Sequence, residues 1–146
     1  MALTYEISDS GIVEITMNNP PVNALAVAGW FELAETFTSL GNRADVRVVI
    51  LRADGRGFNA GVDIKEMQRT EGFEALIGAN RGCYAAFKAV YECAVPVIAA
   101  VNGYCLGGGI GLVGNADTLS PSADAPFGLP ELSRATLRAA PPPPRL

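Results

Sequence analysis

Two short, almost uninterrupted apolar runs, each preceded by a stretch of helical periodicity, constrain this chain most strongly. The runs VRVVIL at residues 46–51 and VPVIAAV at residues 95–101 have the length and composition of strands buried on both faces of a parallel sheet. Apolar residues recur every three or four positions over residues 26–40 and 73–91, which predicts an amphipathic helix before each strand. This alternation predicts an α/β fold with parallel crossover connections.

The chain before and after this alternation carries weaker signals. Residues 5–8 and 12–17 alternate in polarity around the Asp9-Ser10-Gly11 turn, so we expect an antiparallel hairpin. Residues 118–122 make a poor strand by composition, and the four consecutive prolines near the C-terminus favour an extended tail. In the helix over 73–91, the predicted buried face consists of large apolar residues: Phe73, Leu76, Ile77, Tyr84, Phe87 and Tyr91.

Composition and charge remove several classes of function. The 146 residues carry a net charge of −4 without a cluster of Lys or Arg, so we expect neither nucleic acid nor a membrane as a partner. No segment approaches the roughly 20 apolar residues of a membrane-spanning helix, and the N-terminus lacks signal-peptide features, which together predict a cytoplasmic protein. With no histidine, Ser-His-Asp catalysis and His-ligated metals are excluded. The three cysteines lack zinc or disulfide spacing, so we predict no metal.

A glycine-rich stretch follows the second apolar run. Residues 103–117 read GYCLGGGIGLVGNAD and contain six glycines. Residues 109–114 match the G-x-G-x-x-G dinucleotide fingerprint, but there the first glycine should close the strand, whereas Gly109 comes eight residues after Val101. The alternative is an oxyanion site, in which glycines let backbone N–H groups approach a substrate carbonyl. A second glycine-bearing loop, residues 55–67, is expected at the same edge of the sheet.

Segments in these two loops carry a specific resemblance. Residues 58–67, FNAGVDIKEM, and residues 95–109, VPVIAAVNGYCLGGG, closely resemble the enoyl-CoA hydratase/isomerase (crotonase) superfamily in sequence and order. Residues 21–25 and 127–131 are similar to two further segments of that family. The resemblance implies a spiral of ββα units. It divides the chain into a crotonase-like core, the N-terminal portion of the fold, over residues 1–131 and a divergent, Pro-rich tail over 132–146.

The resemblance implies a site for an acyl-CoA thioester. The backbone N–H groups of Val62 and Gly108 would hold the thioester oxygen, and Glu131 would be the catalytic carboxylate. CoA is then part of the substrate, no separate cofactor is expected, and a homo-oligomer, trimer or hexamer, is implied. For Asp63 the residues themselves favour another role, as the cap of a helix that starts at Ile64. The positions carried over to substrate or CoA binding are Asn23, Ala24, Leu25, Ala60, Gly61, Asp63, Ile64, Gly107 and Gly111.

The expected reaction depends on the position two residues beyond the triple glycine. Family hydratases carry a glutamate there, whereas this chain has Gly111, which leaves Glu131 as the single carboxylate. Residues 57–73 and 110–115 resemble the actinobacterial hydrolases of steroid C/D-ring breakdown, which implies retro-Claisen C–C hydrolysis of a steroid-derived acyl-CoA. The alternative is an enoyl-CoA hydratase or double-bond isomerase of fatty-acid oxidation. Gly111 and Gly114 either make room for a bulky acyl group or pack one helix against another.

The last residues differ from the family pattern. Family members continue into C-terminal helices that cover the acyl pocket and build the oligomer, and the proline run prevents residues 132–146 from forming such helices. We therefore expect a chain that is truncated before the helical region and that exposes apolar surface, which favours aggregation or obligate association. This leads to a third hypothesis, an inactive fragment that still binds CoA.

Overall fold

The computed structural model describes residues 3–70 and 72–129 of the chain. It begins with an antiparallel hairpin of β1, Leu3–Ile7, and β2, Ile12–Met17. Hydrogen bonds of 2.9 Å close the turn, from the Ser8 N–H to the Ile12 carbonyl and from the Gly11 N–H to the Ser8 carbonyl. The expected hairpin is confirmed.

The hairpin forms one side of a five-stranded sheet in the order β1-β2-β3-β5-β7. β3, Val48–Ala53, β5, Val97–Val101, and β7, Thr118–Pro121, each pair in parallel with the preceding strand of that order. The two predicted strands are therefore confirmed as β3 and β5, although only one face of each is fully buried and the other is half-buried. Alternate residues on these two strands are fully buried against the helices, which places the core on that face of the sheet: Val49, Leu51, Val97 and Ala99.

A second sheet, which the sequence does not predict, has the order β4-β6-β8. β4, Gly57–Asn59, and β6, Tyr104–Leu106, lie inside the two glycine-bearing loops, and β8, Phe127–Gly128, completes the sheet. All of its pairs are parallel. Strands this short have no periodicity that a sequence pattern can reveal. From β3 onward, each turn of the chain adds one strand to each sheet, which confirms the expected spiral of ββα units.

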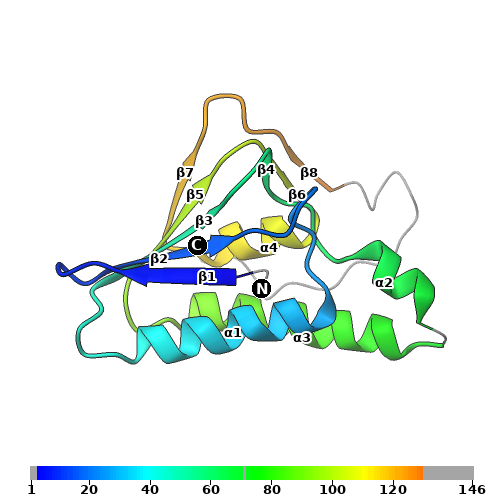
Figure 1. Cartoon of the computed structure of the whole chain (residues 1–146), viewed down its shortest axis with the longest axis horizontal. Coiled ribbons are helices and arrows are strands. Elements are labelled where there is room, and N and C mark those ends of the chain that lie inside the picture. The colour runs from blue at the N-terminus through cyan, green and yellow to red at the C-terminus, as the bar shows by residue number, and fades with distance from the viewer. Residues whose placement is uncertain (1–2, 71, 130–146) are drawn as a thin grey trace.

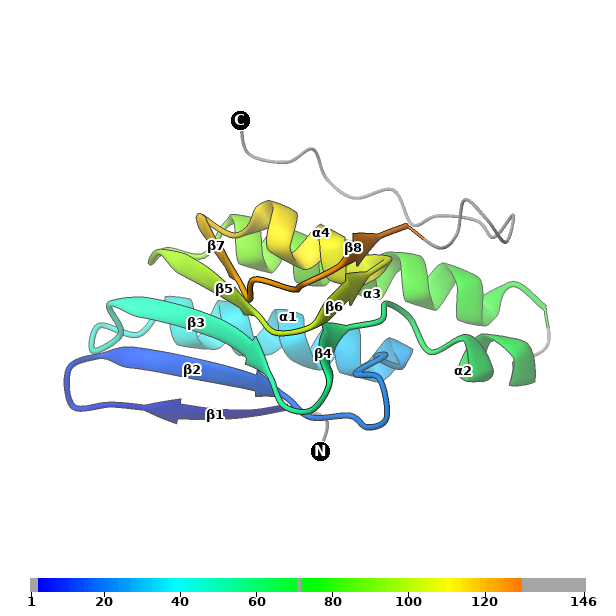
Figure 2. The ribbon, with the colours of Figure 1, turned by 90° about the horizontal axis from the view of Figure 1, so that it is seen from above.

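The described residues also form helices α1, Val27–Gly41, α2, Ile64–Arg69, α3, Glu74–Tyr91, and α4, Gly108–Asn115. The two long helices confirm the predicted segments. In Figure 1 the two sheets and the pair α1 and α3 form three sides of a triangle, with α4 above that pair. Figure 2 shows α1 and α3 behind the strands of the large sheet. None of these helices combines the length and the apolar character that crossing a membrane requires.

The buried face of α3 differs from the expected one. Phe87 is buried as predicted, but four other members of the predicted face are at least 42% exposed: Phe73, Ile77, Tyr84 and Tyr91. Small residues provide most of the buried face instead: Ala75, Ala79, Gly82, Cys83 and Ala86. The reason is the close approach of α1, because a Cβ built on Gly82 would lie only 2.9 Å from the Trp30 Cβ. Large side chains do not fit at this distance and point away from α1.

β7 is a regular edge strand although its composition is poor for one. It pairs in parallel with β5, beginning with Thr118 opposite Ile98. Asp117 secures the start of the pair, because its N–H donates to the Val97 carbonyl at 2.9 Å and its carboxylate accepts the Val97 N–H at 2.8 Å. Backbone pairing with a central strand therefore overrides weak side-chain propensity. Pro121 is tolerated because an edge strand needs partners on one side only.

Candidate active site

The two glycine-bearing loops meet where β4 leads into α2 and β6 leads into α4. Gly61 has a φ of 89°, and a Cβ built on it would lie 3.1 Å from the Gly108 nitrogen. In the opposite direction, a Cβ built on Gly108 would lie 3.4 Å from the Gly61 Cα. The loops are therefore in backbone-to-backbone contact. This contact brings the two predicted donors, Val62 and Gly108, to the same place.

Hydrogen bonds on either side of Val62 determine where its N–H points. The Gly61 carbonyl accepts the Leu25 N–H at 2.9 Å, and the Asp63 N–H donates to the Leu25 carbonyl at 2.9 Å. In a trans peptide the N–H is antiparallel to the preceding carbonyl, so the Val62 N–H points away from Leu25. No described residue accepts it. Val62 therefore offers an oriented donor to a ligand.

The Gly108 N–H is the first of α4 and points out of the helix N-terminus. The Gly107 carbonyl accepts the Ile110 N–H at 3.0 Å, and the Gly107 N–H donates to the Gly128 carbonyl at 3.1 Å. Gly107 has a φ of 52°, which glycine adopts without strain. No described residue accepts the Gly108 N–H. First-turn N–H groups lack intrahelical partners and form the positive end of the helix dipole, so this donor also suits an anion.

Two such donors side by side can bind one oxygen that gains negative charge. Their orientation is set before a ligand arrives, so no reorganisation is needed when the charge develops. Removal of one donor from an oxyanion site costs about 2.7–4 kcal/mol in the activation barrier. A thioester oxygen on its way to an enolate gains such a charge. The arrangement therefore suits enolate chemistry next to an acyl group.

The first two residues of α4 are glycines, and a side chain on either one would clash with the protein interior. A Cβ built on Gly108 would lie 2.9 Å from the indole ring of Trp30. One built on Gly109 would lie 2.8 Å from the Asn59 carbonyl oxygen. Both contacts are with residues that are fully buried. The tight packing of the loop on the core thus explains these glycines, in addition to the access that a ligand needs.

The other two glycines of α4 differ from each other. A Cβ built on Gly111 would overlap the ring of Phe87, which is 2% exposed. Of the two alternatives for Gly111, the structure supports helix packing, because the Phe87 ring occupies the space that a side chain at position 111 would fill. A Cβ built on Gly114 would meet nothing within 4 Å. Packing within the described chain therefore does not explain Gly114.

Residues 23–25 support the first donor loop. Asn23 is 4% exposed and has a φ of 54°, and its amide nitrogen donates to the carbonyls of Asp54 and Gly57 at 2.7 and 2.8 Å. Leu25 is fully buried, and its backbone pairs with that of Val62. Ala24 between them is half-buried. The side chains of Asn23 and Leu25 are thus committed to the fold. The part of residues 23–25 in substrate binding stays a prediction.

The first turn of α2 follows the Val62 donor directly. The Asp63 carboxylate accepts the N–H groups two and three residues further on, at 2.9 and 3.3 Å, which confirms the predicted cap. Ile64 is 51% exposed and Ala60 is half-buried, so both can reach a ligand. The Glu66 carboxylate accepts the Val27 N–H at 2.8 Å and ties α2 to the start of α1. A cavity of about 290 Å³ lies here, lined by Ala26, Asp63, Glu66, Arg69 and Thr70.

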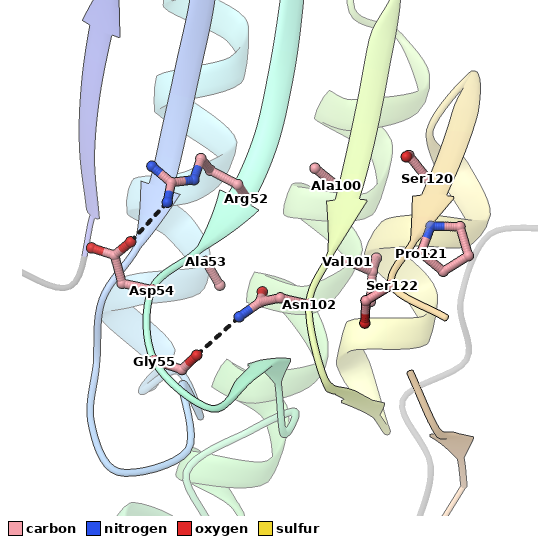
Figure 3. Close-up of a pocket in the computed structure, with 10 residues that line it drawn as sticks. All are labelled: Arg52, Ala53, Asp54, Gly55, Ala100, Val101, Asn102, Ser120, Pro121 and Ser122. Carbon is pink, nitrogen blue, oxygen red and sulfur yellow. Dashed lines mark hydrogen bonds and ion pairs between the residues drawn. The ribbon is translucent and has the colours of Figure 1, made fainter. Parts of the chain in front are cut away.

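A larger cavity of about 510 Å³ lies elsewhere, at the carboxyl ends of β3, β5 and β7 (Figure 3). At its rim Arg52 pairs with Asp54 at 3.1 Å, and the Asn102 amide nitrogen donates to the Gly55 carbonyl at 3.0 Å. The buried Asn102 side-chain oxygen has no partner among the described residues. None of the predicted site residues lines this cavity, so it is separate from the donor pair. Its other lining residues are Ala53, Ala100, Val101, Ser120, Pro121 and Ser122.

The predicted catalytic carboxylate is not among the described residues, and two buried cysteines are poor nucleophiles. Glu131, the predicted catalytic carboxylate, lies outside the described residues, as does the tail over 132–146. Within residues 3–70 and 72–129, no group of three or more Cys, Asp or Glu could hold a metal ion. Burial raises the pKa of the Cys83 and Cys105 thiols to about 12. Neither thiol is therefore an ionised nucleophile at neutral pH.

Two contacts that shape the site escape sequence analysis. Asn59 lies fully buried between the two loops and accepts the Gly61 N–H at 2.7 Å. Trp30 packs against Gly108, and its indole N–H donates to the Leu25 carbonyl at 3.1 Å. The first contact has a local signal, because an asparagine side chain can bind the backbone two residues further on. The second has none, since Trp30 and Gly108 are far apart in the sequence.

Comparison with known proteins gives one consistent result. The sequence profile described as enoyl-CoA hydratase/isomerase matches residues 7–140. The chain is 66% identical over 140 residues to the (7aS)-7a-methyl-1,5-dioxo-2,3,5,6,7,7a-hexahydro-1H-indene-carboxyl-CoA hydrolase of Mycobacterium tuberculosis, and 61% identical over 140 residues to the protein of that name from Rhodococcus jostii. These matches cover 96% of this chain but only 57% and 54% of the relatives, so the chain spans about half their length.

Solved structures have the same fold over the part of their length that this chain covers. An enoyl-CoA hydratase from Bacillus anthracis matches with a TM-score of 0.88 at 31% identity, over 96% of this chain and 55% of that protein. An enoyl-CoA hydratase from Mycobacterium smegmatis matches with a TM-score of 0.86 at 32% identity, over 92% of this chain and 52% of that protein.

Proposed function

The chain belongs to the enoyl-CoA hydratase/isomerase family, and on this basis we propose that it acts on an acyl-CoA thioester whose oxygen binds to the N–H groups of Val62 and Gly108. The observation that carries the proposal is the donor pair. The two N–H groups come from different loops, lie next to the contact between Gly61 and Gly108, and have no acceptor among the described residues. As the reaction we propose hydrolytic ring opening of a steroid-derived, bicyclic acyl-CoA.

The choice of hydrolysis over hydration is supported by similarity and by one residue. The relatives at 66% and 61% identity are both named as hydrolases of an indene-carboxyl-CoA that carries two oxo groups. By contrast, a relative whose name describes a dehydratase, the carnitinyl-CoA dehydratase of Citrobacter koseri, is only 37% identical. Gly111 supports the same choice, because the hydratases of this family that use two carboxylates carry a glutamate at that position.

In the proposed reaction, water adds to a ring ketone that is β to the thioester. Glu131 takes the proton from that water as a general base. The bond between the hydrated carbon and the α-carbon of the thioester then breaks, and its electron pair moves into the thioester. The resulting negative charge lies on the oxygen held by Val62 and Gly108. The hydrated carbon becomes a carboxylic acid, and the α-carbon takes up the proton that Glu131 received from water, so the product is the substrate plus one water.

The proposal also covers the cofactor, the cellular location and the oligomeric assembly. The steps above need no redox or group carrier, so we propose no cofactor besides the CoA of the substrate. We also propose a cytoplasmic location and a homo-oligomeric assembly, trimeric or hexameric. Exposed apolar residues at the N-cap of α3 and on the helix itself support association with another protein surface: Phe73, Ile77 and Tyr84.

A product assay tests the reaction. The chain is incubated with the bicyclic dioxo-indene acyl-CoA and, in parallel, with crotonyl-CoA, and the products are analysed by mass spectrometry before and after methyl esterification. Ring opening adds one water and creates a new carboxylic acid, whereas hydration of crotonyl-CoA adds one water and creates no acid. Turnover of the bicyclic substrate that Glu131→Gln lowers by about 100-fold or more supports the proposal.

Other outcomes of this assay would support one of the alternative functions instead. Turnover of crotonyl-CoA alone would identify a hydratase, and migration of a double bond would identify an isomerase. If the wild type and Glu131→Gln are equally inactive but both bind CoA, the chain is an inactive CoA-binding fragment.

A second pair of variants tests the donor itself. Val62→Pro removes the backbone N–H, whereas Val62→Ala keeps it and changes only the side chain. We expect Val62→Pro to lower kcat by about 100-fold or more and Val62→Ala to retain most activity. Equal activity of the two variants would contradict the role of this N–H.

A further inference from the structure

Asn59, the last residue of β4, contacts both donor loops. It is completely buried. Its side-chain oxygen accepts the Gly61 N–H at 2.7 Å, and its amide nitrogen donates to the Asn23 carbonyl at 2.6 Å. A Cβ built on Gly109 would lie 3.1 Å from the Asn59 Cβ and 3.2 Å from its side-chain oxygen. The first turn of α4 therefore rests directly on Asn59.

We propose that Asn59 is a positioning residue, which sets the orientation and spacing of the Val62 and Gly108 N–H groups through its bond to Gly61 and its contact with Gly109. This inference rests on the proposed function, because it assigns Asn59 to the same oxyanion site. Asn59 does not touch the substrate, since its side chain is enclosed by the protein.

In the first loop, Asn59 acts through Gly61. The Gly61 N–H donates to Asn59, and the Gly61 carbonyl accepts the Leu25 N–H at 2.9 Å, so both polar groups of this residue are held. Glycine otherwise samples a wide range of φ and ψ, and here φ is 89°. The peptide that follows Gly61 carries the Val62 N–H. Holding Gly61 in one conformation therefore holds the first donor in one direction.

In the second loop, Asn59 acts through the start of α4. Gly109 follows the donor Gly108. A Cβ built on Gly109 would meet Asn59, and one built on Gly108 would meet the Trp30 ring. A displacement of Asn59 therefore changes the distance between the two N–H groups. Misplacement of reacting groups by about 1 Å can lower a rate by about 100-fold.

Asn59 is in turn anchored to the large sheet by Asn23. The Asn23 side-chain oxygen accepts the Asn19 N–H at 2.7 Å, and its amide nitrogen binds the carbonyls of Asp54 and Gly57. Asp54 directly follows β3, and Gly57 begins β4. A fully satisfied buried network of this kind is rigid. The donor pair is thereby positioned relative to the end of β3.

A matched pair of variants tests the role of Asn59. Asn59→Ala and Asn59→Ser both remove the bond to Asn23 and leave similar voids, but the serine hydroxyl can still accept the Gly61 N–H in a local turn. Asn115→Ala, at another buried asparagine whose side chain bonds within α4, controls for the loss of a buried amide. The wild type and each variant, as the full chain, are mixed with crotonyl-CoA that carries carbon-13 at the thioester carbonyl. Infrared difference spectroscopy measures the C=O stretch, a titration measures affinity, and circular dichroism checks folding.

We expect the wild type, Asn59→Ser and Asn115→Ala to lower the carbonyl frequency, because hydrogen bonds weaken the C=O bond. Asn59→Ala should lose most of this shift, while its dissociation constant for crotonyl-CoA rises by about tenfold or less. An unchanged shift in Asn59→Ala overturns the inference and leaves the proposed function intact. Equal loss in both Asn59 variants would show that the bond to Gly61 does not position the donors, and it also overturns the inference.

Two further outcomes are decided by the same data. If Asn59→Ala does not fold, a folded Asn59→Ser variant that keeps the shift supports the inference, and one that loses it overturns the inference. If the wild type does not bind crotonyl-CoA, the same measurement is made with the bicyclic acyl-CoA of the proposed function. A wild type that binds its thioester without any shift overturns the proposed function and this inference with it.

Discussion

The loop before α2 and the loop before α4 each present one backbone N–H, but they are built differently. In the first, polar side chains hold the backbone, since Asn59 binds the Gly61 N–H and Asn23 anchors Asn59. In the second, the absence of side chains lets the backbone pack closely, with Gly108 against Trp30.

This difference separates two requirements of an oxyanion site. A hydrogen bond is directional, so the asparagines define where the first N–H points. A close glycine contact defines how near the second N–H lies to its neighbours, because van der Waals contact is sensitive to distance. The first loop should therefore be damaged when a side chain is removed from the network. The second should be damaged when its aromatic support is removed or when a side chain is added.

The largest effect is expected from removing the aromatic support of the second loop. Trp30→Ala deletes a fully buried ring that also contacts Phe87 edge to face at 5.8 Å between ring centroids. The free energy of unfolding should fall by about 3–5 kcal/mol, measured by urea denaturation with circular dichroism. Glu35→Ala, at an exposed position of the same helix, should change it by about 0.5 kcal/mol or less. Similar losses in both variants would show that Trp30 is not a support.

The next effect concerns the polar network of the first loop. Asn23→Gly keeps the φ of 54° accessible but removes the side-chain bonds to Asn19, Asp54 and Gly57. It should lower the free energy of unfolding by about 1–3 kcal/mol. Asn23→Ala should lose about 1–2 kcal/mol more, because a Cβ disfavours this left-handed conformation. Chemical denaturation of the two variants side by side measures the difference, and equal stabilities would contradict the backbone argument.

A smaller effect should follow when a methyl group is added to the second loop's helix. Gly111→Ala forces its Cβ into the Phe87 ring and should destabilise the fold by about 1–3 kcal/mol. In a Phe87→Leu background the same substitution should cost less, because the smaller side chain leaves space. A double-mutant cycle on unfolding free energies measures this coupling. Strictly additive effects would mean that the two residues do not compete for space.

The smallest effect, and one of opposite sign, is expected one helical turn further on. Gly114→Ala adds a Cβ that meets nothing within 4 Å, so it gains helix propensity without a clash. The fold should gain at most about 1 kcal/mol of stability, which appears as a rise in the thermal midpoint. A loss of stability would show that Gly114 is constrained by a contact outside the described residues.

Much of the fold could be predicted because its long elements carry periodicity. The hairpin, α1 and α3 follow from polarity patterns, and β3 and β5 follow from apolar runs, each over four or more residues. β4, β6 and β8 have three residues or fewer and are too short for such a signal. The buried face of α3 was predicted wrongly for a physical reason. Hydrophobicity alone ranks Tyr84 above Ala86, but a helix pair in close contact selects small residues at its interface.

The site could be predicted only in part. The donors Val62 and Gly108 follow from the resemblance of their loops, and the structure brings them together. The Asn59 bond to Gly61 is local and has a sequence signal. The Asn59 bond to Asn23 and the Trp30 contact with Gly108 could not be predicted, because they join segments that only the fold brings together. The role of Glu131 stays a prediction, since that residue lies outside the described chain.

The strand order has a consequence for how the chain can fold during its synthesis. In both sheets every new strand pairs with one that has already been made: β3 with β2, β5 with β3 and β7 with β5, while β6 follows β4 and β8 follows β6. No described strand has to wait for a partner that the ribosome makes later. Structures whose contacts join successive turns can nucleate and propagate along the chain, as repeat proteins do. Among the described strands, growth from the N-terminus therefore leaves β7 and β8 each with one edge that no other described strand pairs with.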